Sequence, residues 1–328
     1  MSKKKMYFLT LDTETATLPF SDELCDNSDD KRKIAIAKPL VYDIGWTISD
    51  RKGNILKKEN FLVQETFFVP SVFNTAYYKD KRPYYLTMMK DGKIKTANWE
   101  NIMTILYNDI INHNISAVTA YNAAFDFKKA IPFTNQYIKN LYSINYNDWE
   151  AEQRKKCQKI LNGEKSDNPD YLIPIFRIFE HEVPIIDLWS VACSKLINHN
   201  KYRDFCLKNE LWSASIQYFS TSAENVYRYL TKDKDFIESH TALDDAIIET
   251  EILTKALKKS KLEPKIEAFP FKNLGTTADY VKIKGKDEFI VKIAEAFEQY
   301  ITQNDGYNKK GGYWSKVCKI YEELLEIA

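Results

Sequence analysis

The sequence predicts an α/β protein in which helices flank a mixed sheet of five strands. Two patterns along the 328 residues lead to this prediction. Short apolar segments that end at polar or turn-forming residues come first, as is typical of buried strands. Later, strand-like segments alternate with segments whose apolar residues recur every three or four positions, as is typical of amphipathic helices. The chain has only 9 glycines and 10 prolines, so long flexible linkers are not expected.

The five expected strands share an apolar or β-branched composition and a polar end. They cover residues 7–11, 40–48, 60–69, 117–121 and 183–186. The first three strands follow one another and predict a three-stranded meander. Residues 20–34, between the first two strands, are polar and acidic and therefore predict a loop.

The expected helices carry apolar residues at helical spacing, as Trp99, Ile102 and Leu106 do. They cover residues 97–113, 187–196, 203–210, 223–231 and 242–259, and a further helix starts at Asn122. Past Lys261 two prolines interrupt the chain, and helical segments follow at 287–303 and 313–327. We therefore expect a first domain at residues 1–260, with an insertion near 145–180, and a helical C-terminal extension of unknown role at 261–328.

Charge and cysteine content exclude some classes of protein and leave others open. Lysine and arginine number 47 and acidic residues 46, which gives a net charge of +1. A nucleic-acid partner must therefore be argued from a site and not from overall charge. The five cysteines form no CxxC pair, which is typical of reduced thiols in a cytoplasmic protein without a zinc site. No apolar segment reaches about eighteen residues, so we expect a soluble protein without a membrane partner.

Two acidic residues, Asp12 and Glu14, follow the first apolar segment at a spacing of two. In an extended chain, side chains at this spacing point to the same face, so two carboxylates are directed together. Keeping both of them ionised requires a nearby cation, and a hard divalent ion with oxygen ligands is suitable. The motif alone is weak, because Asp148 and Glu150 repeat it in a polar stretch, where a solvated pair is expected.

A third acidic residue, Asp126, lies in the first turn of the helix expected after Asn122. Asn122 is a suitable N-cap, and the helix dipole favours an acidic residue in the first turn, which would explain Asp126 without a function. The functional alternative is a third carboxylate that enters the same site from a strand–helix junction. Asp187, at the end of the last strand, is expected to cap a helix.

The start of the helix at 242–259 carries a further group of polar residues. Thr241 with Asp244 matches a capping box, which gives Asp244 a structural role. Asp245 has no such role, and a carboxylate on a helix that is apolar around much of its circumference is costly unless it is paired or binds a metal. His240 precedes the cap, where a near-neutral imidazole suits a general base.

The spacing of His240 and Asp245 does not by itself identify a site. His199 and Asp204 repeat it, and such a pair is more often part of the surface. The order and setting of the three motifs are more informative than any one of them, because a strand, a strand–helix junction and a buried helix each contribute an acidic residue.

Taken together, the motifs resemble those of the DEDDh 3′→5′ exonuclease superfamily, which includes the proofreading subunit of bacterial DNA polymerase III, ribonuclease T and oligoribonuclease. The resemblance covers roughly residues 6–258, and nothing in the family matches 261–328. Tyr121 stands where many relatives have histidine, and the third motif identifies Asp245 rather than Asp244 as the ligand. The matching segments are LTLDTET at 9–15, AYNAAFD at 120–126 and HTALDDA at 240–246.

This resemblance implies an RNase H-like fold and hydrolysis of phosphodiester bonds at the 3′ end of DNA or RNA, with release of nucleoside 5′-monophosphates. Two Mg²⁺ or Mn²⁺ ions roughly 4 Å apart would clamp the scissile phosphate. Asp12 would bridge both ions, Glu14 and Asp245 would complete one, and Asp126 would hold the second. His240 would accept a proton from the attacking water.

The implied partners are nucleic-acid 3′ ends, as single-stranded DNA or RNA, and a replication protein. Thr15, Ala16 and Asn122 are expected to contact the terminal nucleotide, with Phe125 or Phe127 as a stacking ring. Core packing is the commoner role of such rings. The lysine-, asparagine- and isoleucine-rich composition suggests a phage or AT-rich bacterial genome. Lys128 and Lys129 could steer phosphate, although a solvated helix face is the simpler interpretation.

A second hypothesis is a catalytically weak or inactive nuclease fold that binds nucleic acid or a replication partner. That class of protein is expected to lack a ligand, whereas all five positions are filled in this chain. A metal titration combined with a cleavage assay would separate the two hypotheses.

Overall fold

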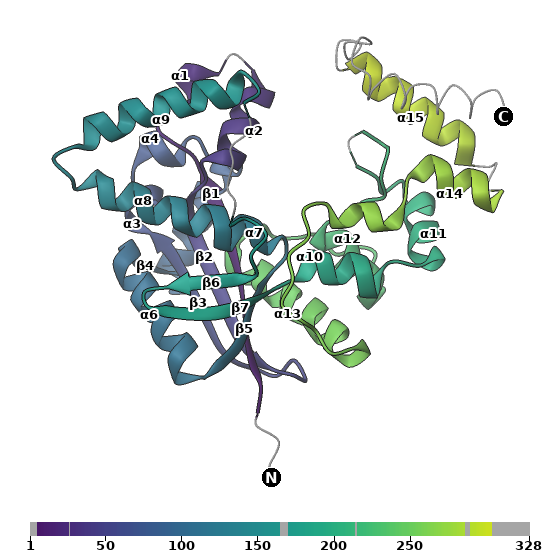
Figure 1. Cartoon of the computed structure of the whole chain (residues 1–328), viewed down its shortest axis with the longest axis horizontal. Coiled ribbons are helices and arrows are strands. Elements are labelled where there is room, and N and C mark those ends of the chain that lie inside the picture. The colour runs from purple at the N-terminus through teal and green to yellow at the C-terminus, as the bar shows by residue number, and fades with distance from the viewer. Residues whose placement is uncertain (1–4, 26, 165–169, 214, 286–288, 304–328) are drawn as a thin grey trace. The chain divides into compact units, whose positions relative to one another are not determined.

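The computed structural model describes residues 5–25, 27–164, 170–213, 215–285 and 289–303 (Figure 1). The chain divides into two units, the first formed by Met1–Leu188 with Glu238–Glu267 and the second by Trp189–Ile237 with Ala268–Ala328. This division differs from the boundary expected at residue 260, since residues 189–237 pack with the later segment. The assignment of 1–260 to a catalytic domain stays a prediction. The helix expected at 313–327 lies outside the described residues.

The first unit is built on a mixed sheet flanked by helices, which confirms the predicted α/β class (Figure 1). The sheet has seven strands in the order β4-β3-β2-β1-β5-β7-β6, and not the expected five. The two unexpected strands, β4 and β6, have only three and four residues, too few to show a periodic pattern. The strands are β1 (Tyr7–Ala16), β2 (Leu40–Asp50), β3 (Ile55–Val63), β4 (Lys95–Ala97), β5 (Ile115–Ala120), β6 (Ile175–Ile178) and β7 (His181–Asp187).

The directions of the strands agree with the sequence pattern. β1 is antiparallel to β2, and β2 is antiparallel to β3, which confirms the expected meander. β5 is parallel to both β1 and β7, so the C-terminal ends of these three strands lie at the same end of the sheet. The expected end of the first strand at residue 11 was wrong, because β1 continues through Asp12 and Glu14 to Ala16.

Two other local predictions were wrong. Residues 20–34 are not a loop, because α1 (Ser21–Leu24) and most of α2 (Ser28–Ala37) lie there, and the Asn27 side chain caps α2 by accepting from Asp30 N. Acidic residues in the first turn of α2 favour the helix dipole, so the composition taken for a loop is that of a helix start. The strand expected at 60–69 ends at Val63, and short helices α3 (Gln64–Phe67) and α4 (Pro70–Phe73) follow.

The remaining helices of the first unit connect and cover the strands (Figure 1). The segment expected as an insertion holds a regular helix, α9, and the strand β6. These helices are η1 (Lys79–Lys81), α5 (Arg82–Lys90), α6 (Trp99–Asn112), α7 (Ala123–Phe125), the π-helical turn η2 (Asp126–Ala130), α8 (Ile131–Leu141), α9 (Tyr146–Leu161) and α13 (Ala242–Lys259).

The second unit is helical in its described residues. Of its helices, α12 starts and ends at the expected residues, α11 is shifted by two to three residues from the expected 203–210, and η4 and α14 were not expected. They are α10 (Leu188–Val191, whose first residue belongs to the first unit), η3 (Ala192–Leu196), α11 (Asn200–Lys208), α12 (Ala223–Thr231), η4 (Pro270–Leu274), α14 (Thr277–Lys284) and α15 (Ile290–Gln303). Across both units, no described helix combines the length and apolar character that a bilayer crossing requires.

The two faces of the β1–β2 pair differ in chemistry, and this difference positions the site. Directly paired residues of neighbouring strands point to the same face, and alternate residues point to opposite faces. One face is hydrophobic and belongs to a buried cluster that includes Trp99 and Leu106 of α6; its strand residues are Leu9, Leu11, Ile44, Trp46 and Ile48. The other face is polar, with Thr10 paired to Thr47, Asp12 to Gly45 and Glu14 to Asp43.

Helix α13 packs on the polar face. The hydroxyl groups of Thr47 and Thr250 lie 2.6 Å apart, which joins β2 to the middle of the helix. At the start of the helix, Gly45 allows the closest approach: a Cβ atom added there would lie 2.3 Å from Leu243 N and 2.5 Å from Leu243 Cα. The absence of a side chain at Gly45 therefore lets the first turn of α13, which carries Asp245, pack on the β2 residue that is paired with Asp12.

Replacing Gly45 by alanine is expected to lower the free energy of unfolding by about 3 kcal/mol, since backbone atoms of α13 cannot yield to the new methyl group. Urea denaturation would measure this loss. Gly92→Ala is the control, because Gly92 has a positive φ of +68° but no atom within 4 Å of the added Cβ. That change is expected to cost only the conformational strain, about 1 kcal/mol. Equal losses in the two variants would contradict the close approach at Gly45.

Candidate functional site: a carboxylate cluster between β1 and α13

Asp12, Glu14 and Asp245 come together because β1 and α13 meet at Gly45. Asp12 and Glu14 share the polar face of β1, and Asp245 is in the first turn of α13. Ligand atoms of Glu14, His240 and Asp245 all lie within 4.8 Å of one another. Asp245 is 6% exposed, and its Oδ1 atom has no hydrogen-bond partner among the described residues. A buried carboxylate oxygen in this state is costly unless a ligand satisfies it.

Asp126 approaches β1 on the side of the strand that pairs with β5. The pairing of β1 with β5 ends at Thr10 and Thr119, so beyond Thr10 the described part of β5 no longer pairs with β1. Asp126, at the start of η2, contacts β1 beyond this point: its Oδ1 atom accepts a hydrogen bond from Thr13 Oγ1 at 2.6 Å, and its carboxylate also accepts from the Thr13 main-chain N–H. Asp126 is buried, and its carboxylate acts electrostatically on Asp12, as those of Asp245 and Glu14 do, so the four predicted carboxylates lie near one another.

The electrostatics of the cluster follow from this convergence. Burial raises the pKa of Asp12 well above its ordinary value, and the carboxylates of Glu249, Asp126, Asp245 and Glu14 raise it further. Burial, followed by Asp245, likewise raises the pKa of Glu14. Burial raises the pKa of Asp126 to about 7 and that of Asp245 to about 8. The mutual repulsion means that the fully ionised cluster requires added positive charge.

His240 is held at the edge of the cluster by contacts to three side chains. Its ring stacks on Tyr78 with centroids 4.5 Å apart, and its Nδ1 atom lies 3.7 Å from Glu238 Oε2. Lys81 Nζ donates to the carbonyl oxygens of Ser239 and His240. These contacts stabilise a left-handed backbone at His240, with φ of 49°, which is uncommon outside glycine. Burial and then Lys81 lower the pKa of His240, so the imidazole is neutral at neutral pH.

The start of α13 is capped differently from the prediction. Thr241 precedes the helix but makes no side-chain cap bond, and its Oγ1 atom donates to Asp244 Oδ2 at 2.9 Å. The first free main-chain N–H, that of Ala242, instead donates to Asp43 Oδ2 at 3.0 Å. Tyr85 OH donates to the same oxygen at 2.9 Å. The prediction that Thr241 and Asp244 form a capping box is therefore wrong. The carboxylate of Asp43, from β2, caps the helix instead.

A similar exchange occurs at the second motif. Asn122 was expected to cap the helix, but it adopts a left-handed conformation with φ of 67° and makes no side-chain cap bond. Asp187 Oδ1, from the end of β7, accepts from Ala123 N at 3.0 Å. The expectation that Asp187 caps a helix is confirmed, although the helix is α7 from a distant part of the sequence. Because β5 and β7 are parallel neighbours, the end of one lies beside the helix that follows the other.

Sequence reasoning missed four residues of this region. Asp43, Tyr78 and Lys81 lie beside the predicted residues and position them. Glu249, one turn after Asp245 on α13, is a fifth acidic residue next to Asp12. Only Glu249 carried a usable signal, since it lies four positions after Asp245 on a helix predicted to be buried and therefore shares a face with it.

The residues expected to contact a terminal nucleotide have different surroundings. Thr15, Asn122 and Phe125 are partly buried and remain candidates. Ala16 is buried in a hydrophobic cluster, so its side chain cannot meet a ligand, and Phe127, at 2% exposed, packs on Phe176 with centroids 4.8 Å apart. Phe127 is therefore a core residue.

Lys128 and Lys129, and the residues that repeat the Asp-x-Glu and His-x4-Asp spacings, make contacts within the protein or lie apart on a helix surface. Lys128 Nζ donates to Ile175 O, and Lys129 Nζ lies 5.0 Å from the Tyr171 ring centre, so both lysines pack on the protein. Asp148 and Glu150 lie on α9, where a spacing of two separates them on the helix surface. In the second unit, the His199 side chain caps α11 by accepting from Tyr202 N, and Asp204 accepts from Tyr280 OH.

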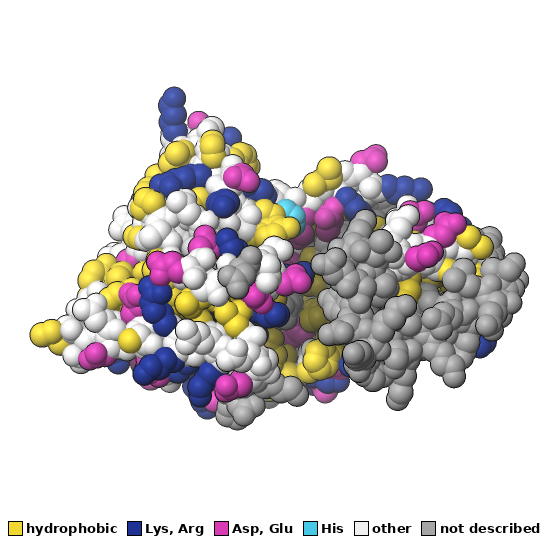
Figure 2. All heavy atoms as spheres, turned by 90° about the horizontal axis from the view of Figure 1, so that it is seen from above, with side chains coloured by type: hydrophobic (Ala, Val, Ile, Leu, Met, Phe, Trp, Pro, Cys, Tyr) yellow, Lys and Arg dark blue, Asp and Glu magenta, His cyan; other side chains and the backbone are white. Residues whose placement is uncertain are grey.

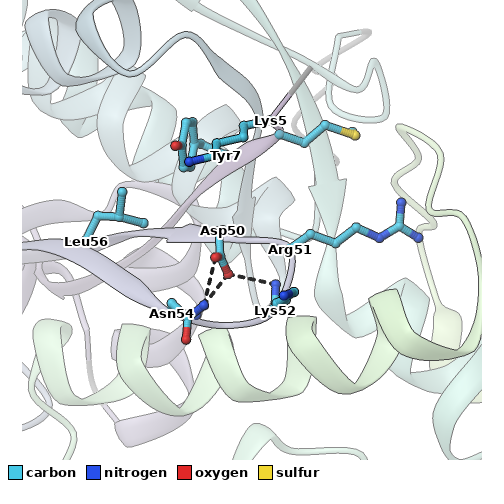
Figure 3. A pocket seen from close by; sticks show the side chains of 8 residues that line it. Lys5, Tyr7, Asp50, Arg51, Lys52, Asn54 and Leu56 are labelled. Atoms are coloured by element: carbon cyan, nitrogen blue, oxygen red, sulfur yellow. Dashed lines mark hydrogen bonds between the residues drawn. The ribbon is translucent and has the colours of Figure 1, made fainter. Parts of the chain in front are cut away.

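A surface pocket of the first unit lies away from the cluster. The pocket in Figure 3 lies where Tyr7 pairs with Asp50, at the end of β1 far from Glu14. Seven residues separate these positions, which is roughly 23 Å along a strand. The Asp50 carboxylate is already occupied by Lys52 N and by the main chain and side chain of Asn54, which close the β2–β3 turn. On the face shown in Figure 2, basic and acidic side chains are interspersed.

Comparison of the chain with models of protein families, with curated proteins and with solved structures gives no match.

The cluster fits divalent cations. Its donors are carboxylate oxygens, the ligands that Mg²⁺ and Mn²⁺ prefer. Asp245 Oδ1 is buried and lacks a hydrogen-bond partner among the described residues, as expected of an oxygen kept for a ligand. Lys81 is the cation that lowers the pKa of Glu14 and of Asp245, and one such charge cannot neutralise four or five carboxylates.

Proposed function

We propose that this protein is a divalent-cation-dependent 3′→5′ exonuclease with an RNase H-like fold, and that it hydrolyses phosphodiester bonds at the 3′ end of DNA or RNA. The observation that carries the proposal is a group of acidic residues around Asp12. Glu14, His240 and Asp245 have ligand atoms within 4.8 Å of one another, and Glu14, Asp126 and Asp245 all act electrostatically on Asp12. The mixed sheet, with an antiparallel β1–β2–β3 meander and β5 and β7 parallel to β1, is compatible with the proposed fold. The three sequence motifs that resemble the DEDDh superfamily supply these five residues.

Each side chain has a role in this proposal. Asp12, Glu14, Asp126 and Asp245 would hold two Mg²⁺ or Mn²⁺ ions. When bound, the cations would supply positive charge to the scissile phosphate and lower the pKa of the attacking water. Thr13 orients Asp126 through its hydroxyl and main-chain N–H, and Asp43 fixes the start of α13 and thereby the position of Asp245. Thr15, Asn122 and Phe125 are the proposed contacts to the terminal nucleotide.

His240 is proposed as the general base. It would accept a proton from the attacking water on a free ring nitrogen, which requires a neutral imidazole. Burial and Lys81 lower its pKa and favour that neutral form. The stack on Tyr78 restricts rotation of the ring, so the nitrogen that accepts the proton is held in place before the substrate binds. The ring is also close enough to Glu14 and Asp245 to ligate a cation, and the test below separates the two roles.

The proposed activity is tested with end-labelled DNA and RNA oligonucleotides, single- and double-stranded, in Mg²⁺, Mn²⁺ or EDTA. We expect products that shorten from the 3′ end, mononucleotide release, and no reaction in EDTA. A circular single strand is the matched control and should resist cleavage, because it has no end. Cleavage of the circle would indicate an endonuclease, and binding without cleavage in either metal would indicate an inactive nuclease fold.

Replacing His240 by glutamine is expected to lower kcat at least tenfold, and general-base catalysis is typically worth about a hundredfold or more. Calorimetry should show Mn²⁺ binding unchanged. The rate of the wild-type protein should rise with pH as the imidazole loses its proton, with a midpoint below 6.5 because the pKa is lowered, and the variant should lack this rise. His199→Gln has the same His-x4-Asp setting and should keep full turnover. Loss of Mn²⁺ binding in His240→Gln would make the residue a ligand and not a base.

A further inference from the structure

Glu249 is an acidic residue that none of the three sequence motifs contains. It lies four residues after Asp245 on α13, so both side chains leave the same face of the helix, the face that packs on β1 and β2. Its side chain is only 2% exposed. An acidic residue buried to this degree needs partners for both of its oxygens.

The structure gives Glu249 a partner on one side only. Its carboxylate accepts a hydrogen bond from the main-chain N–H of Tyr121, the residue between the end of β5 and α7. Its Oε2 atom has no hydrogen-bond partner in the part of the chain that the structure describes. The groups that act most strongly on it are the carboxylates of Asp126 and Asp245, and it is in turn the carboxylate that acts most strongly on Asp12.

We propose that Glu249 is a fifth carboxylate of the cation site: one oxygen is held by Tyr121, and the other, Oε2, is left as a ligand for the cations that Asp12, Asp126 and Asp245 would hold. This inference rests on the cation site of the proposed function. Through Tyr121, Glu249 also ties the strand–helix junction that leads to Asp126 to the helix that carries Asp245. It therefore also helps to position both, and in its ionised form it adds negative charge that bound cations would neutralise.

A purely structural role is the alternative, and it makes a different prediction. If Glu249 served only as an acceptor for Tyr121 N–H, glutamine would serve equally, because its carbonyl oxygen accepts the same bond without a charge. Replacing Glu249 by glutamine would then leave cation affinity unchanged. If Glu249 belongs to the cation site, the same substitution weakens cation binding and relieves repulsion in the cation-free protein.

The experiment compares Glu249→Gln with the wild-type full chain in a Mn²⁺ titration by calorimetry, without nucleic acid, and in thermal melting with EDTA or Mn²⁺. We expect Mn²⁺ affinity to fall about tenfold or more. We also expect the EDTA-treated variant to melt above the wild type, and its gain in melting temperature from Mn²⁺ to be smaller. Glu251→Gln is the matched control, since Glu251 lies on the same helix and faces Lys255 at 3.9 Å; both readouts should stay at wild-type values.

Two results would overturn the proposal. One is an unchanged Mn²⁺ affinity in Glu249→Gln. The other is an EDTA-treated variant that melts below the wild type or does not fold, because either behaviour would make Glu249 a structural acceptor. The titration contains no substrate, so its outcome does not depend on cleavage. A protein that binds Mn²⁺ through Glu249 but leaves every oligonucleotide intact would refute the nuclease and retain this inference.

Discussion

Replacing Asp12 by asparagine is expected to reduce cleavage at least about a thousandfold, the scale on which loss of one electrostatic group acts at a catalytic centre. Asparagine keeps the size of the side chain and removes its charge. Asp12 is the carboxylate on which Glu249, Asp126, Asp245 and Glu14 all act, so it lies at the centre of the cluster. Turnover of a single-stranded 3′-labelled oligonucleotide in saturating Mn²⁺ would measure the loss.

Asp148→Asn is the control for this substitution. Asp148 belongs to the same Asp-x-Glu pattern but is exposed on α9, and its replacement should leave turnover at the wild-type level. The Asp12→Asn protein should also melt higher than the wild type in EDTA, since one source of repulsion is gone. Turnover above a tenth of the wild-type rate in Asp12→Asn would contradict a central role for Asp12 and with it the proposed nuclease.

Removal of divalent cations is expected to make the stability of the protein fall as pH rises from 5 to 8. Burial raises the pKa of Asp43 and Asp126 to about 7 and of Asp245 to about 8, from an ordinary value of 3.8. Between pH 3.8 and about pH 7 to 8, these carboxyl groups keep their protons in the folded chain but have lost them in the unfolded chain. Stability from these groups is therefore complete below about pH 4 and is lost as pH rises through 7 and 8.

Scanning calorimetry from pH 5 to 8, in EDTA and in Mn²⁺, tests whether stability falls as pH rises. In EDTA we expect the melting temperature at pH 8 to lie about 5 °C or more below its value at pH 5.5. Mn²⁺ should restore most of the difference at pH 8 and little at pH 5.5, because protons compete with the cation for the same oxygens. An EDTA-treated protein that becomes more stable toward pH 8 would show that the carboxylates do not share one buried place.

Much of the fold could be predicted from local sequence. Helices α12 and α13 begin and end at the expected residues because a capping or extended residue precedes each and the apolar spacing is regular. The meander followed from three apolar strands close together in the chain. Short elements could not be predicted, since the three residues of β4 and the four of β6 are too few to carry a period, and α2 was hidden by an acidic first turn that resembles a loop.

By itself, the sequence determined which residues could carry chemistry: Asp12 and Glu14 at strand spacing, Asp126 after a strand, and His240 with Asp245 at a helix start. Only the tertiary structure decided what surrounds them. Asp43 caps α13, Asp187 caps α7, Tyr78 stacks on His240, and Glu249 joins the carboxylates. Each of the first three contacts joins residues at least 64 positions apart in the chain. Local periodicity reports the face on which a side chain lies, whereas sheet pairing and the close approach at Gly45 determine which distant side chain it meets.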